Sequence, residues 1–288
     1  MSLSPTEPIH AMRGSQDGSL LFCAHQRPSI TLWDIQTGGL IHTFTLKQTV
    51  SDIAISLGDR YLACRLFDST IKREVATKME CPFSRNNLQV THLCWLDPEE
   101  KIAVTLAASV HIRDIASAKV LRLFKMLDST IRGMVYSQRR DELIILTTSS
   151  TGSTINIIHP LRGSPSTPRG IQQSIYCFAF SRTSNQLVCG TEKIGLELSD
   201  TSTQLWRHFE YPSRITSVSF LSNGTVVAGV KSSGIQVLSL DNGPTTSQQP
   251  ILPILTVHTF DQGRIIPVLP TSRDHVVLFE LATMSPLS

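Results

Sequence analysis

Cysteine and histidine are the residues of this chain that could bind a metal or supply a nucleophile, yet their spacing supports neither role. The 288 residues include six cysteines and nine histidines, with no Cys-x-x-Cys pair and no cysteine–histidine spacing typical of zinc sites. The sequence also lacks the Gly-x-Ser-x-Gly elbow of serine hydrolases and the Gly-x-x-x-x-Gly-Lys-Ser/Thr loop that binds nucleotide phosphates. We therefore predict no catalytic residue, no cofactor and no metal site, and we expect that the protein is not an enzyme.

The composition favours a folded protein and does not indicate nucleic acid or a membrane as a partner. Lys and Arg number 26 against 23 Asp and Glu, and 41% of the residues are hydrophobic, which is enough apolar material for a core. A net charge of +3 is too small to indicate nucleic acid or an anionic membrane as a partner. The first ten residues do not resemble a secretory signal, and no apolar run reaches the ~18 residues that span a bilayer. We predict a cytoplasmic protein with reduced, buried cysteines that binds neither nucleic acid nor membranes.

A repeat of about 40 residues organises the chain, and this is the period of a β-propeller blade. Each unit has a first apolar run, a second run after a polar turn, a third run such as Ile30–Asp34 and a weaker fourth run such as Leu40–Phe44. The first runs begin at Ile9, Val50, Val90, Ile131, Ile175, Ile215 and Ile254. We predict an all-β fold in which residues 1–288 form a single domain, a seven-bladed β-propeller of four-stranded antiparallel blades. A two-sheet sandwich or an irregular barrel is the alternative.

The first unit resembles a WD repeat. Residues 14–24 are followed by Ile30–Gly38, which contains Trp33-Asp34, the only Trp-Asp pair in the sequence. At the matching places, other units have Arg73-Glu74, Arg113-Asp114 and Phe279-Glu280, and no Gly-His pair opens a unit. The resemblance to the WD-repeat family implies a propeller that binds proteins. The departures from the family pattern imply that its His/Asp/Ser/Trp hydrogen-bond tetrad is mostly lost.

The last unit and two loops depart from the regular pattern. The seventh unit ends after its third run, Val276–Leu281, and residues 1–8 contain two prolines, so we expect an incomplete last blade with a poor closing strand. Two segments rich in Pro, Gly and Ser, Leu161–Gly170 and Asp241–Pro250, are expected to be mobile spacers between blades. Residues 272–285 resemble the propeller regions of fungal NACHT-type signalling proteins, which implies a ligand-sensing module of a larger ATPase.

Basic loop residues are the candidate binding site. In a propeller, the loops between the second and third strands and the loops between blades lie on one face. The candidate partner-binding residues on this face are Arg27, Lys193, Arg214, Lys231 and Arg273. Because arginine makes bidentate contacts with carboxylate and phosphate groups, we predict an acidic or phosphorylated protein or peptide partner. Ordinary solvated loop charge is the alternative.

The functional hypothesis is therefore a non-enzymatic protein–protein interaction scaffold, acting as a monomer or as part of a larger complex. The NACHT-type ligand sensor is one alternative. A propeller hydrolase is another, and it would need several metal-binding carboxylates from the innermost strands. Among the three innermost segments Ser51–Ala54, Thr91–Cys94 and Thr216–Ser219, Asp52 is the single carboxylate, which argues against a hydrolase.

Overall fold

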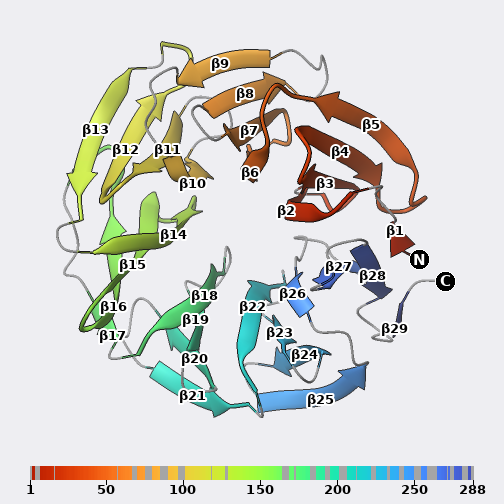
Figure 1. Ribbon diagram of the computed structural model, residues 1–288. Coiled ribbons are helices and arrows are strands. Elements are labelled where there is room, and N and C mark those ends of the chain that lie inside the picture. The colour runs from red at the N-terminus through yellow and green to blue at the C-terminus, as the bar shows by residue number, and fades with distance from the viewer. Residues whose placement is uncertain are drawn as a thin grey trace.

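The strands of the protein follow one another around a ring (Figure 1). The structure is a computed structural model, and it describes residues 2–3, 7–15, 17–56, 58–66, 70–74, 80–84, 90–96, 101–117, 119–126, 129–163, 169–171, 173–181, 186–191, 195–200, 206–211, 213–221, 225–231, 234–239, 243–249, 254–257, 265–270, 272, 276–280 and 285–286. Within these residues, the strands form six four-stranded sheets and one five-stranded sheet.

The sheets share one antiparallel order, in which the first strand lies nearest the centre of the ring and the later strands follow outward (Figure 1). The first strands are β2 (Ile9–Gly14), β6 (Val50–Ile55), β10 (Val90–Trp95), β14 (Thr130–Ser137), β18 (Ile175–Phe180), β22 (Ile215–Phe220) and β26 (Ile254–Val257). The second strands are β3 (Leu20–His25), β7 (Tyr61–Leu66), β11 (Lys101–Leu106), β15 (Glu142–Ser149), β19 (Gln186–Thr191), β23 (Val226–Val230) and β27 (Ile265–Pro270).

The third and fourth strands complete the sheets toward the outside. The third strands are β4 (Ser29–Asp34), β8 (Thr70–Glu74), β12 (Ser109–Asp114), β16 (Gly152–Ile158), β20 (Gly195–Asp200), β24 (Gly234–Ser239) and β28 (Val276–Glu280). The fourth strands are β5 (Leu40–Thr45), β9 (Glu80–Ser84), β13 (Val120–Lys125), β17 (Arg169–Ile171), β21 (Trp206–Glu210) and β25 (Gly243–Gln249). Two short strands, β1 (Ser2–Leu3) and β29 (Ser285–Pro286), both pair with β28.

The predicted all-β propeller of four-stranded antiparallel blades is confirmed. Six of the seven first strands begin at the residue that the repeat predicts, and the remaining one, β14, begins one residue early at Thr130. The count of seven blades stays a prediction here, because the second, sixth and last sheets contain strands whose side chains lie outside the described residues.

The second strands are buried on both faces because each lies between neighbouring sheets. In β3, β11, β19 and β23, every residue after the first position of the strand is buried, which explains their continuous apolar runs. Cys23, Cys64 and Cys189 occupy the same fourth position of their strands and are buried free thiols. These small apolar side chains suit the close approach of sheets, as the sequence predicts. Cys94 and Cys177 are free thiols of intermediate exposure, so the prediction of buried cysteines is correct only in part.

The hydrophobic core is a set of clusters, each shared by two adjacent sheets. Phe22 and Phe44 of the first sheet pack with Leu62 of the second, for example. Met12 of the first sheet packs with Leu278 of the last sheet. The ring is therefore closed by the same apolar packing between first and last sheets that joins the other neighbours.

The expectation of an incomplete last blade is wrong. Leu3 pairs with Val276 and Ser2 with Val277, while Pro286 pairs with Phe279 farther along β28. Two segments from opposite ends of the sequence therefore occupy the outer edge of β28. Ladder pairing uses main-chain groups, so a strand of two residues can cover an edge without the β-branched pattern that we expected.

The two predicted spacers also contain strands. Arg169–Ile171 at the end of the first spacer pairs with β16, and Gly243–Gln249 within the second pairs with β24. These strands lie at the outside of their sheets, where little apolar surface has to be buried. Proline is tolerated at such an edge, which is where Pro244 pairs with Leu238.

Candidate functional site

A β-bulge lies near the start of each first strand among the described residues. In β2, Ile9 pairs with His25 and Ala11 pairs with Ala24, so His10 is the extra residue of the bulge, between two successive pairs of the ladder. Such a bulge turns a side chain out of the regular alternation of a strand. The corresponding residues of the other first strands are Ser51, Thr91 with His92, Arg132, Tyr176, Thr216 and Leu255. They lie where the first strands begin, at the end of the central channel that we call the channel mouth.

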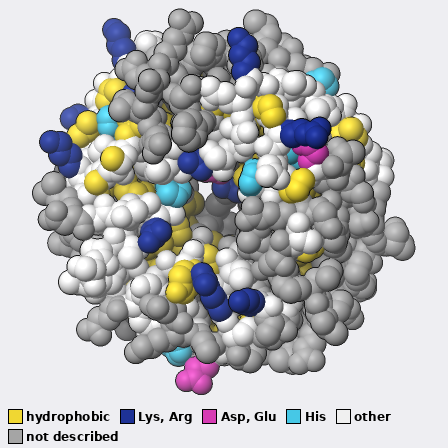
Figure 2. Space-filling view, viewed as in Figure 1, with side chains coloured by type: hydrophobic (Ala, Val, Ile, Leu, Met, Phe, Trp, Pro, Cys, Tyr) yellow, Lys and Arg dark blue, Asp and Glu magenta, His cyan; other side chains and the backbone are white. Residues whose placement is uncertain are grey.

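Basic side chains gather at this mouth. Arg13 of β2 donates from Nη2 to Asp52 Oδ1 of β6 at 3.2 Å, although its side chain is 40% exposed. Arg13 Nη1 donates to the Met12 carbonyl at 2.8 Å. Figure 2 shows Lys, Arg and His side chains around the central opening of the molecule.

Arg65 is the most tightly held cation of the group. Its Nη1 donates to the Val90 carbonyl at 3.1 Å and its Nη2 to the Ser51 carbonyl at 3.3 Å. Its Nε is buried without a hydrogen-bond partner. Burial lowers the pKa of Arg65, and the Asp52 carboxylate opposes this effect. The guanidinium is thus oriented by two carbonyls while its charge is only partly compensated.

His92 of β10 lies among these groups. Its ring Nδ1 is 3.2 Å from Thr91 Oγ1, and its backbone N–H donates to Thr105 Oγ1 at 2.7 Å. Burial lowers the pKa of His92 most, with Arg65 and Arg13 acting in the same direction. Asp52 and a backbone hydrogen bond with Arg132 raise the pKa. His92 is therefore neutral near pH 7 and adds no charge to the mouth.

Arg214 and Lys231, two of the predicted binding residues, lie together in neighbouring loops. Lys231 donates its backbone N–H to the Arg214 carbonyl at 2.9 Å, and both residues are exposed. The Arg214 guanidinium lies over the ring of Tyr176, with Cζ 3.7 Å from the ring centre. Tyr176 is the bulge residue of β18, so this pair joins a predicted loop cation to the channel mouth.

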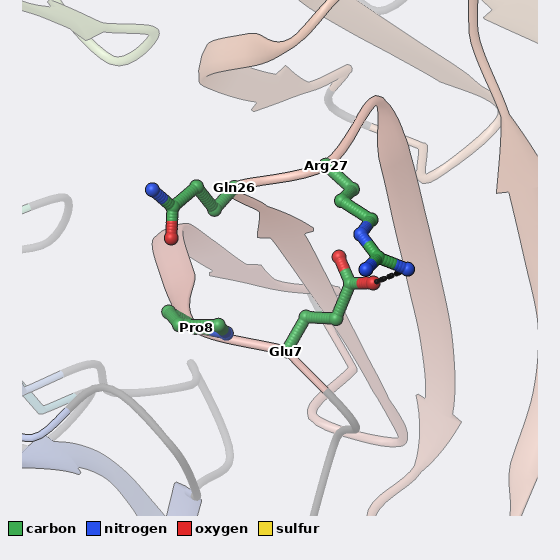
Figure 3. A pocket seen from close by; sticks show the side chains of 4 residues that line it. All are labelled: Glu7, Pro8, Gln26 and Arg27. Atoms are coloured by element: carbon green, nitrogen blue, oxygen red, sulfur yellow. Dashed lines mark ion pairs between the residues drawn. The ribbon is translucent and has the colours of Figure 1, made fainter.

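Arg27 lies apart from this group and is engaged in an ion pair. Its Nη1 is 2.9 Å from Glu7 Oε1, and Figure 3 shows the two side chains pointing toward one another. With Pro8 and Gln26 they line a pocket of about 560 Å³. The charge of Arg27 is thus offset by the carboxylate of Glu7, which lies just before β2, and this makes Arg27 a weaker anion ligand than Arg214.

The other predicted binding residues, Lys193 and Arg273, lie outside the described residues. Their role stays a prediction. The channel arginines Arg13, Arg65 and Arg132, by contrast, were not among the predicted residues. The sequence carries a signal for Arg132: large apolar residues stand at positions 1 and 4 of the first runs, as in Ile131 and Met134. A regular strand repeats every two residues, so this odd spacing indicates a bulge that redirects the intervening side chains.

A buried polar network joins His25, Thr31 and Trp33 in the first sheet. Trp33 Nε1 donates to Thr31 Oγ1 at 2.8 Å, and His25 Nε2 is 2.7 Å from the same oxygen. His25 Nδ1 lies 3.2 Å from the Glu7 carbonyl. The three side chains are at most 9% exposed, so this network stabilises the fold and does not face a ligand.

The described residues contain no group of three or more His, Cys, Asp or Glu side chains that could hold a metal ion. In the same part of the chain, no helix has the length and apolar character needed to cross a membrane.

Comparison with solved structures finds the same fold in WD40 propellers. The WD40 repeats of RRP9 superpose with a TM-score of 0.78 at 15% identity, over 94% of this chain and 89% of that chain. The structure of U3-55K superposes with a TM-score of 0.78 at 16% identity, over 94% of this chain and 90% of that chain. No protein-family model and no curated protein matches the sequence. The ring of antiparallel sheets, the single Trp-Asp pair and these superpositions together identify the fold of the chain as that of the WD40-repeat β-propellers.

Proposed function

We propose that the protein is a non-enzymatic interaction scaffold, a seven-bladed propeller that binds an acidic or phosphorylated segment of a protein partner at the channel mouth. The observation that carries this proposal is the Arg214–Tyr176 stack, in which an exposed guanidinium is held 3.7 Å from the ring centre of a bulge residue. The six four-stranded sheets and one five-stranded sheet of the described residues support the count of seven.

The site suits binding because its cations are exposed while their backbones are fixed. Ile215 follows Arg214 and is fully buried, and Lys231 directly follows the buried strand β23. Residues on short loops between buried strands lose little conformational entropy when a partner binds. An extended partner segment could therefore be recognised without a large rearrangement of the propeller.

The test is a charge reversal of Arg214→Glu with Lys231→Glu, compared with Lys119→Glu with Lys125→Glu as a charge-matched control. Lys119 and Lys125 are exposed at or next to the outer strand β13, away from the channel. Cross-linked partners recovered from the native cells are quantified for the wild type and both variants. Loss of a defined set of partners in the first variant alone supports the proposal. Equal recovery by all three proteins overturns it.

No observation supports the alternative functions more strongly than it supports the scaffold function. The resemblance to NACHT-type signalling proteins concerns residues 272–285, half of which lie outside the described residues, and it stays a prediction. We further propose that the protein has no nucleic-acid partner, because the net charge is only +3. We propose a cytoplasmic location because Cys23, Cys64 and Cys189 are free thiols.

A further inference from the structure

Two guanidinium groups and one carboxylate come together at the channel mouth, and a neighbouring first strand carries a third arginine. Arg13, Arg65 and Arg132 come from β2, β7 and β14, whereas Asp52 is on β6. His92 is electrostatically coupled to Arg13, Arg65 and Asp52 and hydrogen bonds with the backbone of Arg132. Since neutral His92 contributes no charge, the group retains an excess of positive charge facing the opening.

We propose that this group is an anion subsite, in which Arg13 and Arg65 beside Asp52, together with the exposed Arg132 of β14, bind one phosphate or carboxylate group carried by the partner segment. This inference rests on the proposed function and makes its partner more specific. The Arg214 and Lys231 pair contacts the flanking part of the segment, and the channel mouth receives the anionic group itself.

Preorganisation is the first argument for an anion subsite. The Arg65 guanidinium is fixed by the Val90 and Ser51 carbonyls at 3.1 and 3.3 Å. The Arg13 guanidinium is fixed by Asp52 and by the Met12 carbonyl. Guanidinium groups held in place before binding lose little side-chain entropy when an anion arrives, and their planar donors match phosphate and carboxylate oxygens.

The bulge of β14 is the second, independent argument. Arg132 is exposed and is the residue that the β14 ladder passes over. The next residue is Gly133, where an added Cβ would lie 2.5 Å from Phe178 Cε1. The backbone that carries Arg132 is therefore pressed against the neighbouring sheet and cannot shift freely. Bulges of this kind often aim side chains at binding sites.

Asp52 explains why Arg13 and Arg65 can lie close together without a ligand. Its carboxylate pairs with Arg13 at 3.2 Å and interacts favourably with Arg65. The same carboxylate must repel an incoming anion. Removing the charge of Asp52 should therefore strengthen anion binding, although it makes the unliganded cluster less ordered. A purely structural ion pair would show the loss of order without the gain in anion affinity.

The experiment measures binding by the full chain of a fluorescent peptide with one phosphoserine, its aspartate version and its serine version, at constant ionic strength. Inorganic phosphate serves as competitor and distinguishes a phosphate on a peptide from the free ion. The variants are Arg132→Gln, Asp52→Asn and, as an exposed control, Lys125→Gln. We expect the phosphoserine peptide to bind more tightly than its serine version, with Arg132→Gln about fivefold weaker and Asp52→Asn about fivefold tighter. Lys125→Gln should match the wild type.

Several outcomes overturn the subsite. One is equal binding of the phosphoserine and serine peptides. Others are an Asp52→Asn variant that does not tighten binding and an equal loss in Lys125→Gln. If inorganic phosphate binds as tightly as the phosphoserine peptide, the site binds a free anion and the proposal is wrong.

If the subsite fails while Arg214→Glu with Lys231→Glu still loses its cellular partners, the scaffold function stands without the subsite. Retention of all partners by that double variant overturns the scaffold function separately.

Discussion

The guanidinium of Arg214 stacks on the ring of Tyr176, with 3.7 Å between Cζ and the ring centre. The two residues belong to neighbouring sheets, since Tyr176 is on β18 and Arg214 precedes β22. A cation–π contact at an exposed position contributes roughly 0.5–1 kcal/mol. Its larger effect here is to hold a flexible cation in one orientation at the channel mouth.

The first prediction tests this stack. Tyr176→Phe keeps the aromatic face and should leave partner affinity within about twofold of the wild type, whereas Tyr176→Leu should weaken it about threefold to fivefold. The measurement is isothermal titration with a partner identified by cross-linking. A Phe variant that loses as much affinity as the Leu variant would show that the hydroxyl group, and not the stack, matters.

The second prediction concerns the close approach of β14 and β18. Gly133→Ala places a Cβ about 2.5 Å from Phe178 Cε1, so it should lower the free energy of unfolding by about 1–3 kcal/mol. Chemical denaturation measures the change. Gly58→Ala is the matched control, because nothing lies within 4 Å of a Cβ there.

A double-mutant cycle shows whether the clash itself causes the loss. Phe178→Leu shortens the side chain that meets the new Cβ. The double variant should therefore be destabilised by less than the sum of the two single destabilisations. Strict additivity would mean that Gly133→Ala acts through the backbone of the bulge and not through Phe178.

The sequence predicts the inner strands of each blade well and the outer strands unevenly. Inner strands such as β3 are buried on both sides, so their apolar runs and their spacing reveal them. Outer strands such as β25 are made of residues like Thr, Ser and Gln, because no neighbouring sheet covers them. The strand β1 pairs through main-chain groups over two residues, and such pairing leaves almost no pattern in the side chains.

The candidate site was predictable in part for a related reason. Arg214 and Lys231 lie in loops whose position follows from strand order alone, and the structure brings them together. Arg13 and Arg65 lie within strands, where a regular alternation would give no reason to place their charges beside Asp52. Their convergence depends on how adjacent sheets pack against one another, since Arg13 contacts β6 and Arg65 contacts β10. Arg27 illustrates the converse, since its loop was predicted correctly but its pairing with Glu7 was not.

The third prediction is a loss of stability on acidification that depends on His25. Burial lowers the pKa of His25 below its usual 6.5. In the network, Trp33 donates to Thr31 Oγ1 and the Thr31 hydroxyl is placed to donate to His25 Nε2, which requires a neutral ring. Because the folded pKa is lower than the unfolded one, the stabilisation is complete above about pH 6.5 and is lost as the pH falls through the folded pKa.

Thermal unfolding between pH 7.5 and 5 tests this dependence. His25→Asn should be less stable than the wild type at pH 7.5 and should lose less stability on acidification. His92, whose pKa is also lowered by burial, should account for part of the remaining slope. A His25→Asn variant with the wild-type slope would show that this network is indifferent to protonation.

The last prediction concerns the outer edge of the last sheet. Ser2 and Leu3 pair with Val277 and Val276, so a chain that begins at Glu7 leaves that half of β28 open. Main-chain amides at an open edge exchange with solvent through local opening that costs little free energy. Hydrogen exchange followed by mass spectrometry should show faster exchange in Val276–Glu280 of the shortened chain, while the buried strand Val226–Val230 exchanges as before. Unchanged exchange in Val276–Glu280 would mean that the packing of Leu278 with Met12 protects β28 without its N-terminal partner.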